Sequence, residues 1–215
     1  MGAELQLPEQ KVILKGVSWE TYERLLAEHE GESGTRFAYD SGTLEILVPS
    51  ARHEKPNRLL ASLVEVLAEE MALNIESLGS TTLKRPDLLK GFEPDSCFYI
   101  QHAEAIRDNE EVDLTVDPPP DLVIEIDITS SSLDKFPLYA AVGVPEVWRY
   151  ADGAVEIWCL TAEAYSVSNT SQALPGITAN LVRHCLDEAR TATNQAMWFK
   201  NVVAAVEGSR RGTTP

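Results

Sequence analysis

The chain has 215 residues, 44% of them hydrophobic and 24% charged, which is the balance of an ordinary globular protein with one substantial core, so a single domain over residues 1–215 is expected. Its net charge of −16 argues against simple binding to nucleic acid, because that binding depends on Lys and Arg side chains that neutralise phosphates. No apolar run reaches the roughly 18 residues that span a bilayer, no signal peptide precedes the domain, and the three cysteines form neither a disulfide framework nor a metal knuckle. A cytoplasmic protein without a membrane partner is predicted.

Three elements are predicted in the first third of the chain. Ser18 is a favourable N-cap for a helix that runs to about residue 28. Ser41-Gly42 separates two alternating segments and predicts a hairpin over residues 37–48. Apolar residues recur at spacings of three and four from about residue 54 to 73, which predicts a long helix with His53 at its start. A histidine there is either a surface or capping group or part of a site.

The remaining elements alternate between strands and helices. Strands are predicted at 75–84, 95–100, 121–128, 145–150, 155–160 and 165–168, and helices at 104–107, 133–142 and, in one or two pieces, 181–206. Ser130-Ser-Ser132 supplies N-cap oxygens for the helix at 133–142, and it is a weaker candidate for a serine nucleophile because no histidine lies nearby. Trp148 and Trp158 are interpreted as core aromatics of the last hairpin. This order predicts an α/β domain with a mixed central β-sheet flanked by helices.

The segment at 121–128 carries an unusual pair of charges. Its apolar, β-branched residues are typical of a strand buried on both faces, yet Glu125 and Asp127 lie within it. Side chains two residues apart project from the same face of a strand, so two carboxylates would share one buried face. Their burial is costly unless a cation compensates them, which indicates a metal site with hard oxygen ligands. The alternative is that Asp127 is solvated at the strand end while Glu125 pairs with an Arg or a Lys.

A second acidic group lies upstream, at Pro94-Asp95. Proline suits the first position of a strand, and Asp95 stands at the start of the strand predicted at 95–100. If this strand neighbours the strand at 121–128, the Asp95 and Glu125 carboxylates could converge on one cation. A Pro-Asp pair is also common in turns, so alone it carries little weight.

Together these motifs resemble the metal site of the PD-(D/E)XK restriction-endonuclease-like superfamily. The flanking sequence is similar to the Uma-type family of restriction-endonuclease-like proteins, a domain of unknown function that is abundant in cyanobacteria. The matching pieces cover about residues 15–180, and they are Gly42–Pro49, His53, Glu93–Asp95, Pro120–Glu125 and Tyr139–Trp148. The resemblance implies a restriction-endonuclease-like fold in which Asp95 and Glu125 bind Mg²⁺ or Mn²⁺.

The chain departs from the family pattern at two positions. The lysine of the superfamily would stand two residues after Glu125, where this chain has Asp127. Lys135 and Lys84 are the two candidates for supplying that lysine from elsewhere. A glutamate that the family often carries in its first hairpin is replaced here by Ala38.

Basic residues are scarce around the acidic motifs. Between Glu104 and Asp127 nine acids accompany a single base, Arg107. Lys84, Arg85 and Lys90 cluster just ahead of the Pro-Asp pair, either as a basic rim beside the site or as a solvated loop.

Two functions follow as hypotheses. The first is a metal-dependent DNA endonuclease in which Asp95 and Glu125 hold the cation, Asp127 is a further ligand or supports one, and Lys135 or Lys84 orients the attacking water. The second is a nuclease scaffold that has lost catalysis and acts as a protein-interaction module, expected as a homo-oligomer, most simply a dimer. Negative charge weakens DNA as a partner and favours the second. A lysine folded against the carboxylates would favour the first.

Overall fold

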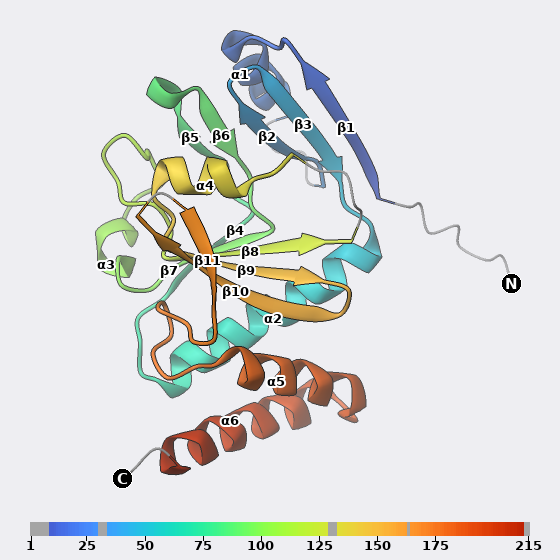
Figure 1. Cartoon of the computed structure of the whole chain (residues 1–215), viewed down its shortest axis with the longest axis vertical. Coiled ribbons are helices and arrows are strands. Elements are labelled where there is room, and N and C mark those ends of the chain that lie inside the picture. The colour runs from blue at the N-terminus through green and yellow to red at the C-terminus, as the bar shows by residue number, and fades with distance from the viewer. Residues whose placement is uncertain (1–8, 30–33, 129–132, 163, 213–215) are drawn as a thin grey trace, which may run out of the picture.

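The computed structural model describes residues 9–29, 34–128, 133–162 and 164–212, and within them the strands form two sheets (Figure 1). The first sheet is antiparallel, with the order β1-β3-β2-β6-β5. Its strands are β1 Gln10–Lys15, β2 Arg36–Asp40, β3 Thr43–Val48, β5 Leu83–Arg85 and β6 Lys90–Phe92. The second sheet has the order β11-β10-β9-β8-β7-β4, and its strands are β4 Glu76–Gly79, β7 Ser96–Tyr99, β8 Leu122–Asp127, β9 Glu146–Ala151, β10 Ala154–Thr161 and β11 Ala164–Ser168.

The helices complete the architecture. They are α1 Trp19–Glu28, α2 Ala51–Glu70, α3 Ala103–Ile106, α4 Phe136–Val142, α5 Ala179–Thr191 and α6 Gln195–Gly212, with a 3-10 turn at Pro86–Leu88. In Figure 1, α2, α5 and α6 lie below the second sheet, whereas α4 lies on its other side, toward the first sheet. None of the described helices is both long enough and apolar enough to span a membrane.

The first sheet packs on α1, which begins as the sequence predicts. The Ser18 hydroxyl accepts a hydrogen bond from the backbone N–H of Thr21 at 3.2 Å, which caps the helix. Tyr22 of α1 is fully buried and stacks on Tyr39 of β2 with ring centroids 5.0 Å apart. A Cβ atom at position 91 would collide with the Tyr22 ring, so Gly91 on β6 permits this close approach of helix and sheet.

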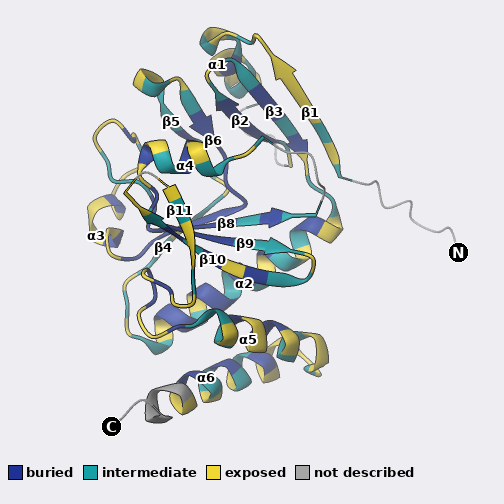
Figure 2. Ribbon diagram, in the orientation of Figure 1, coloured by how far each residue is buried: buried dark blue, intermediate teal, exposed yellow. Residues whose placement is uncertain are grey.

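Strand β8 lies inside the second sheet and has two different faces. It pairs with β9 in parallel and with β7 in antiparallel orientation, so the sheet is mixed. Leu122, Ile124 and Ile126 belong to the core cluster that includes α2, α5 and α6, whereas Val123 belongs to the cluster on the α4 side. Because side chains alternate, residues 125 and 127 also lie on the α4 side. Figure 2 shows buried residues concentrated along β8 and β9, with exposed residues on β1 and β11.

The lower face of the second sheet is sealed by apolar contacts. Leu60, Leu63 and Leu67 of α2 are fully buried and belong to the same cluster as Trp148 of β9 and Trp198 of α6. The Trp198 indole N–H donates to the Cys185 carbonyl at 2.7 Å, which links α6 to α5. This packing fixes the position of α2, whose first turns contact Asp95.

The α/β class is confirmed, and the structure differs from the sequence prediction in four places, of which the first is the short strand β6 at Lys90–Phe92, which was not predicted. The strands are divided between two sheets instead of forming one central sheet. Strand β1 was not predicted, because its exposed apolar residues do not alternate with polar ones. The segment 75–84 is two strands in different sheets, separated after Gly79, whose φ of 59° interrupts an extended chain.

Other boundaries shift by a few residues. Helix α2 begins at Ala51, so His53 lies in its first turn. Helix α4 begins at Phe136 and ends at Val142, and Gly143, with a φ of 84°, follows it in the left-handed conformation that a glycine adopts readily. The predicted Ser130-Ser-Ser132 cap lies outside the described residues.

Candidate active site

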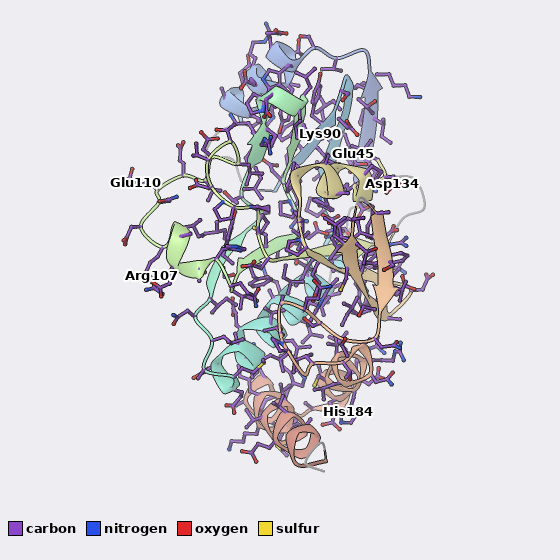
Figure 3. The ribbon with its side chains drawn as sticks, turned by 60° about the vertical axis from the view of Figure 1, so that its left-hand side comes forward. Glu45, Lys90, Arg107, Glu110, Asp134 and His184 are labelled. Carbon is purple, nitrogen blue, oxygen red and sulfur yellow. The ribbon has the colours of Figure 1, made fainter. Side chains whose placement is uncertain are left out.

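A cleft of about 630 Å³ lies on the α4 side of the second sheet. Its floor is the end of β8, with Glu125 and Asp127, and one wall is the beginning of α4. Glu45 of β3 and Asp134, just before α4, line it from the side of the first sheet. Figure 3 shows these two residues at the same flank of the molecule, while His184 on α5 lies toward the opposite end. The cleft therefore lies where the two sheets meet.

Asp95 precedes β7 and reaches into this cleft, although only 2% of the residue is exposed. One carboxylate oxygen accepts a hydrogen bond from the Arg36 guanidinium, and the other accepts one from the backbone N–H of Ile126 at 2.6 Å. Burial acts to raise the pKa of Asp95, but His53 and Arg36 more than offset it and lower that pKa below its ordinary value. Asp95 is therefore an ionised carboxylate held against strand β8.

The first turns of α2 support Asp95 from behind. The side-chain amide of Asn57 donates from Nδ2 to the Asp95 backbone carbonyl at 3.0 Å, and its Oδ1 accepts a hydrogen bond from the Ser96 hydroxyl at 2.9 Å. The His53 ring is 1% exposed, and its Nε2 atom lies 3.3 Å from the second carboxylate oxygen of Asp95 without the alignment of a hydrogen bond. These contacts explain why a histidine and an amide lie on the buried face of α2, which is otherwise apolar.

Glu125 lies on the same cleft and has two partners from the α4 region. Lys135 donates from Nζ to one carboxylate oxygen at 2.9 Å, and the Tyr139 hydroxyl donates to the other. Burial raises the pKa of Glu125, and the nearby Asp95 carboxylate adds to the increase, while Lys135 and Tyr139 oppose it. A carboxylate with a raised pKa beside a second carboxylate is an electrostatic arrangement that a bound cation would stabilise.

Lys135 is the cation at the centre of this cluster. Its side chain is 10% exposed, and burial alone would lower its pKa. The carboxylates of Glu125, Asp95 and Glu45 outweigh that effect, so the pKa is raised and the ammonium group stays charged. Together with Arg36, which pairs with Asp95 and Glu54, Lys135 faces four acids, which leaves the cluster with excess negative charge.

Glu45 is a part of the site that the sequence analysis missed. It stands opposite Ala38 in the β2–β3 hairpin, is 2% exposed, and accepts a hydrogen bond from the backbone N–H of Leu133 at 2.7 Å. The hairpin thus carries an acid at position 45, directly opposite Ala38, where the family resemblance implies a glutamate. Glu45 lies two residues from both Thr43 and Leu47, so it shares their face of the strand, and this alternation could have identified it.

Arg36 and Tyr139 were also missed, and each for a different reason. Arg36 is paired with Asp95 and with Glu54 at 2.5 Å across different elements, so nothing local marks it. Tyr139 is fully buried in α4, where sequence reasoning assigns an aromatic residue to the core.

The other predicted site residues are arranged differently. Asp127 does line the cleft, but its carboxylate is paired with Arg149 of the adjacent strand β9 at 2.5 Å. Lys84 lies on β5, away from the cleft lining, and pairs with Glu23 of α1 at 3.7 Å. Of the two candidate lysines, the structure therefore brings Lys135, not Lys84, to Glu125.

The basic cluster ahead of Asp95 is also neutralised by local acids. Arg85 donates twice to Asp87, at 2.8 and 2.7 Å, and Lys90 contacts Asp40 at 2.5 Å. Lys90 and Asp40 are partly buried, so this pair is not part of a solvated loop, and the pairs leave little free positive charge for a phosphate backbone.

Comparison with known proteins identifies the family. The family model Uma2, described as "Putative restriction endonuclease", matches residues 19–184, which is more than half of the chain. The chain belongs to the Uma2 family. A solved structure described as a "putative nuclease belonging to DUF820" from Anabaena variabilis superimposes with a TM-score of 0.56 and 13% identity, covering 79% of this chain and 99% of the other. That likeness confirms the restriction-endonuclease-like fold. Among curated proteins nothing matches the Uma2 chain.

The resemblance implies a divalent cation, and the residues of the cleft fit one. In the described part of the chain, no three His, Cys, Asp or Glu side chains form a group that could hold a metal by themselves. Mg²⁺, however, is commonly held by one or two carboxylates together with water and substrate phosphates. Asp95 and Glu125 offer two hard oxygen donors on one cleft with excess negative charge. Asp127 is a weaker candidate ligand, because Arg149 already neutralises it.

Proposed function

We propose that this Uma2 protein is a metal-dependent nuclease that hydrolyses phosphodiester bonds in the cleft between its two sheets. The observation that carries the proposal is the salt bridge between Lys135 and Glu125 beside Asp95. This salt bridge places a lysine beside the aspartate and the glutamate of the cleft, although the sequence has Asp127 at the expected lysine position. Burying a lysine among three acids is costly, which favours a functional role over a purely structural ion pair.

Asp95 and Glu125 would hold Mg²⁺ or Mn²⁺, and the ion would lower the pKa of a bound water and polarise the phosphate. Asp95 can serve because Arg36 and the Ile126 N–H keep it ionised and fixed on β8. Tyr139 holds Glu125 in place through its hydroxyl, which stays protonated because its pKa is raised by burial and by Glu125. These contacts are made before a substrate binds, so the donor atoms are preorganised.

Lys135 has two roles in this proposal. Its ammonium group stays charged, because the surrounding carboxylates raise its pKa, and it can balance negative charge that develops on the phosphate. It can also orient the attacking water by donating a hydrogen bond. Both roles require only that Lys135 turns from Glu125 toward the cleft when substrate binds.

One observation favours a second function, that of an interaction module. Val12, Ile13 and Leu14 of the edge strand β1 are between 40% and 51% exposed, and no described strand pairs with the outer side of β1. Exposed apolar edges invite pairing with another chain, and a second copy of β1 in antiparallel register would extend the sheet. Sedimentation of wild type and Ile13→Glu tests this: a dimer that Ile13→Glu converts to monomer supports it, and a monomeric wild type refutes it.

The nuclease proposal is tested by cleavage of single-stranded and duplex DNA in Mg²⁺ or Mn²⁺. Cleavage is expected, EDTA should stop it, and Glu125→Gln should abolish it without unfolding the chain, since Gln keeps the size of the side chain but removes its charge. Glu65→Gln, an exposed site on α2 outside the cleft lining, is the matched control and should cleave like wild type. Cleavage by Glu125→Gln at the wild-type rate would mean that the activity belongs to another site or to a contaminant. Inactivity of wild type with every metal and substrate would leave the interaction module.

A further inference from the structure

An aromatic wall forms one side of the proposed active site. It consists of Phe136 at the start of α4, Trp158 on β10 and Tyr165 on β11, which are partly buried and line the cleft. The Phe136 ring centroid lies 5.2 Å from that of Trp158 and 5.1 Å from that of Tyr165. Phe136 directly follows Lys135, so the wall adjoins the cation of the site.

Trp158 corrects one expectation from the sequence. Trp148 is fully buried and belongs to the core on the α2 side, as predicted. Trp158 pairs with Val147 and projects from the opposite face of the hairpin, where it lies at the cleft instead of in the main core. A tryptophan kept at the edge of a polar cleft offers an aromatic face to whatever binds there.

The wall is held in place by hydrogen bonds at the edges of its rings. The Tyr165 hydroxyl donates to the Val144 carbonyl at 2.6 Å, and the Trp158 indole N–H donates to Glu156 at 3.2 Å. The polar atoms of both rings thus already have hydrogen-bond partners within the protein. A ligand meets the apolar parts of the rings, which favours stacking over hydrogen bonding.

The charge of the cleft limits the number of phosphates that it can accept. Its six acids outnumber its three bases, and these residues are Glu9, Glu45, Asp95, Glu125, Asp127 and Asp134 against Lys11, Lys135 and Arg149. A duplex that follows the surface would bring many phosphates toward an acidic protein of net charge −16. A volume of about 630 Å³ is that of a small-molecule pocket, with room for an unpaired nucleotide and too little for a turn of duplex.

From the juxtaposition of this aromatic wall with the Asp95, Glu125 and Lys135 cluster, we infer that the substrate is an unpaired strand. One base stacks on Trp158 and Phe136, and the phosphate beside that base lies at Asp95, Glu125 and Lys135. The inference rests on the proposed nuclease function for the location of the phosphate. Stacking recognises any base, because every base has an aromatic face, so cleavage shows little sequence preference.

The experiment measures binding separately from cleavage. Fluorescence anisotropy of end-labelled oligothymidylate and of a duplex with the same number of phosphates is recorded with Ca²⁺, and cleavage is recorded in parallel with Mg²⁺ or Mn²⁺. Wild type should bind the single strand more tightly than the duplex. Trp158→Leu should weaken single-strand binding by about 5- to 150-fold, the loss of one stacked base, while Trp158→Phe keeps most of the affinity.

A matched control and a salt titration complete the test. Trp19→Leu removes a tryptophan of the α1 cluster, outside the cleft lining, and should bind like wild type. With at most three cleft cations to neutralise phosphates, the slope of log K against log salt should be no steeper than about −2 for a single strand. A slope several times steeper would place the bound strand elsewhere and overturn the inference.

The outcomes separate the two proposals. Tighter binding of duplex, or equal single-strand binding by Trp158→Leu and wild type, overturns the inference even if metal-dependent cleavage is observed. Single-strand binding that depends on Trp158 in a protein that never cleaves supports the aromatic site and overturns the nuclease function. Absence of binding to either oligonucleotide overturns the inference.

Discussion

A buried glutamate and a partly buried one, on neighbouring strands of the second sheet, show how differently the protein treats a carboxylate. Glu146 begins β9 and faces the sealed side, where it accepts hydrogen bonds from Trp148 Nε1 and Ser171 Oγ, both at 2.6 Å, and from the backbone N–H groups of Gln172 and Ala173 at 2.5 and 3.2 Å. Glu125 on β8 faces the cleft and is held by two side chains, Lys135 and Tyr139.

The two glutamates differ in whether their hydrogen-bond partners can move away. Backbone amides cannot leave Glu146, so that carboxylate ties the loop at 171–173 to β9 and has a structural role. A lysine can turn away from Glu125 when a cation or a phosphate enters the cleft. A buried acid fixed by main-chain and neutral donors is therefore part of the fold, whereas a buried acid held by a mobile charge is available for chemistry.

The largest expected effect tests the structural half of this comparison. Glu146→Ala leaves five neutral donors without their acceptor, the four above and the Cys159 thiol, so the free energy of unfolding should fall by about 3–5 kcal/mol. Urea denaturation measures this loss, and Glu156→Ala, exposed on β10, should change stability by no more than about 0.5 kcal/mol. Equal stabilities of the two variants would mean that Glu146 is not an anchor.

The second prediction concerns the two lysines. Lys135→Ala should lower the rate of DNA cleavage by about 100-fold or more, because it removes the cationic donor at the proposed site. Lys84→Ala should leave the rate unchanged, because Lys84 pairs with Glu23 and does not line the cleft. Initial rates at saturating Mg²⁺ distinguish the variants, and a loss in Lys84→Ala with retention in Lys135→Ala would reverse the assignment.

The third prediction uses the pH dependence of stability. In the folded protein the pKa of Glu125 lies above 4.5, so the folded state holds this proton more tightly than the unfolded chain. The free energy of unfolding therefore falls as pH rises from 4.5 through the folded pKa. Lys135→Met removes the opposing charge, so this fall should grow to about 1–3 kcal/mol at neutral pH and disappear at acid pH.

A double variant provides the control for that prediction. Glu125→Gln combined with Lys135→Met removes the carboxylate that is hydrogen-bonded to Lys135 together with the lysine, so its stability should depend less on pH than that of Lys135→Met alone. Denaturation curves at several pH values test this, and an identical pH profile for the single and double variants would show that the destabilisation does not arise at Glu125.

The smallest effect is expected at the pair of Asp127 and Arg149. Both side chains are about one third exposed, so solvent screens the interaction, and a double-mutant cycle with Asp127→Asn and Arg149→Gln should give a coupling of at most about 1 kcal/mol. Because Asp127 is paired with Arg149 and is not expected to bind the metal, Asp127→Asn should retain cleavage. Loss of cleavage equal to that of Glu125→Gln would make Asp127 a ligand after all.

The sequence allowed the elements with strong local signals to be predicted. The cap at Ser18, the Ser41-Gly42 turn and the buried strand at β8 depend on neighbouring residues, and each is found where the pattern indicates it. The division into two sheets could not be predicted, because strand pairing over long separations depends on tertiary packing. Edge strand β1 lacks any period, so its pairing with β3 leaves no local signal.

The candidate site was predictable to a similar degree. Asp95 and Glu125 stand in short motifs, and the alternation of strand β8 placed Asp127 on the same face as Glu125. Their partners come from distant elements, Arg36 from β2, His53 from α2 and Tyr139 from α4, and contacts of this kind arise only when the chain folds. The choice between Lys84 and Lys135 likewise required the position of α4.

The central claim is that Asp95 and Glu125 hold one divalent cation, and a crystal structure grown with Mn²⁺ tests it most directly. Anomalous diffraction should locate one ion in the cleft at roughly 2.0–2.6 Å from an oxygen of each carboxylate, with Lys135 close by and no ion at Glu146. The same peak should be missing from crystals of Glu125→Gln. A cleft without Mn²⁺ at millimolar concentration, or an ion bound elsewhere while Lys135 still contacts Glu125, would contradict the account.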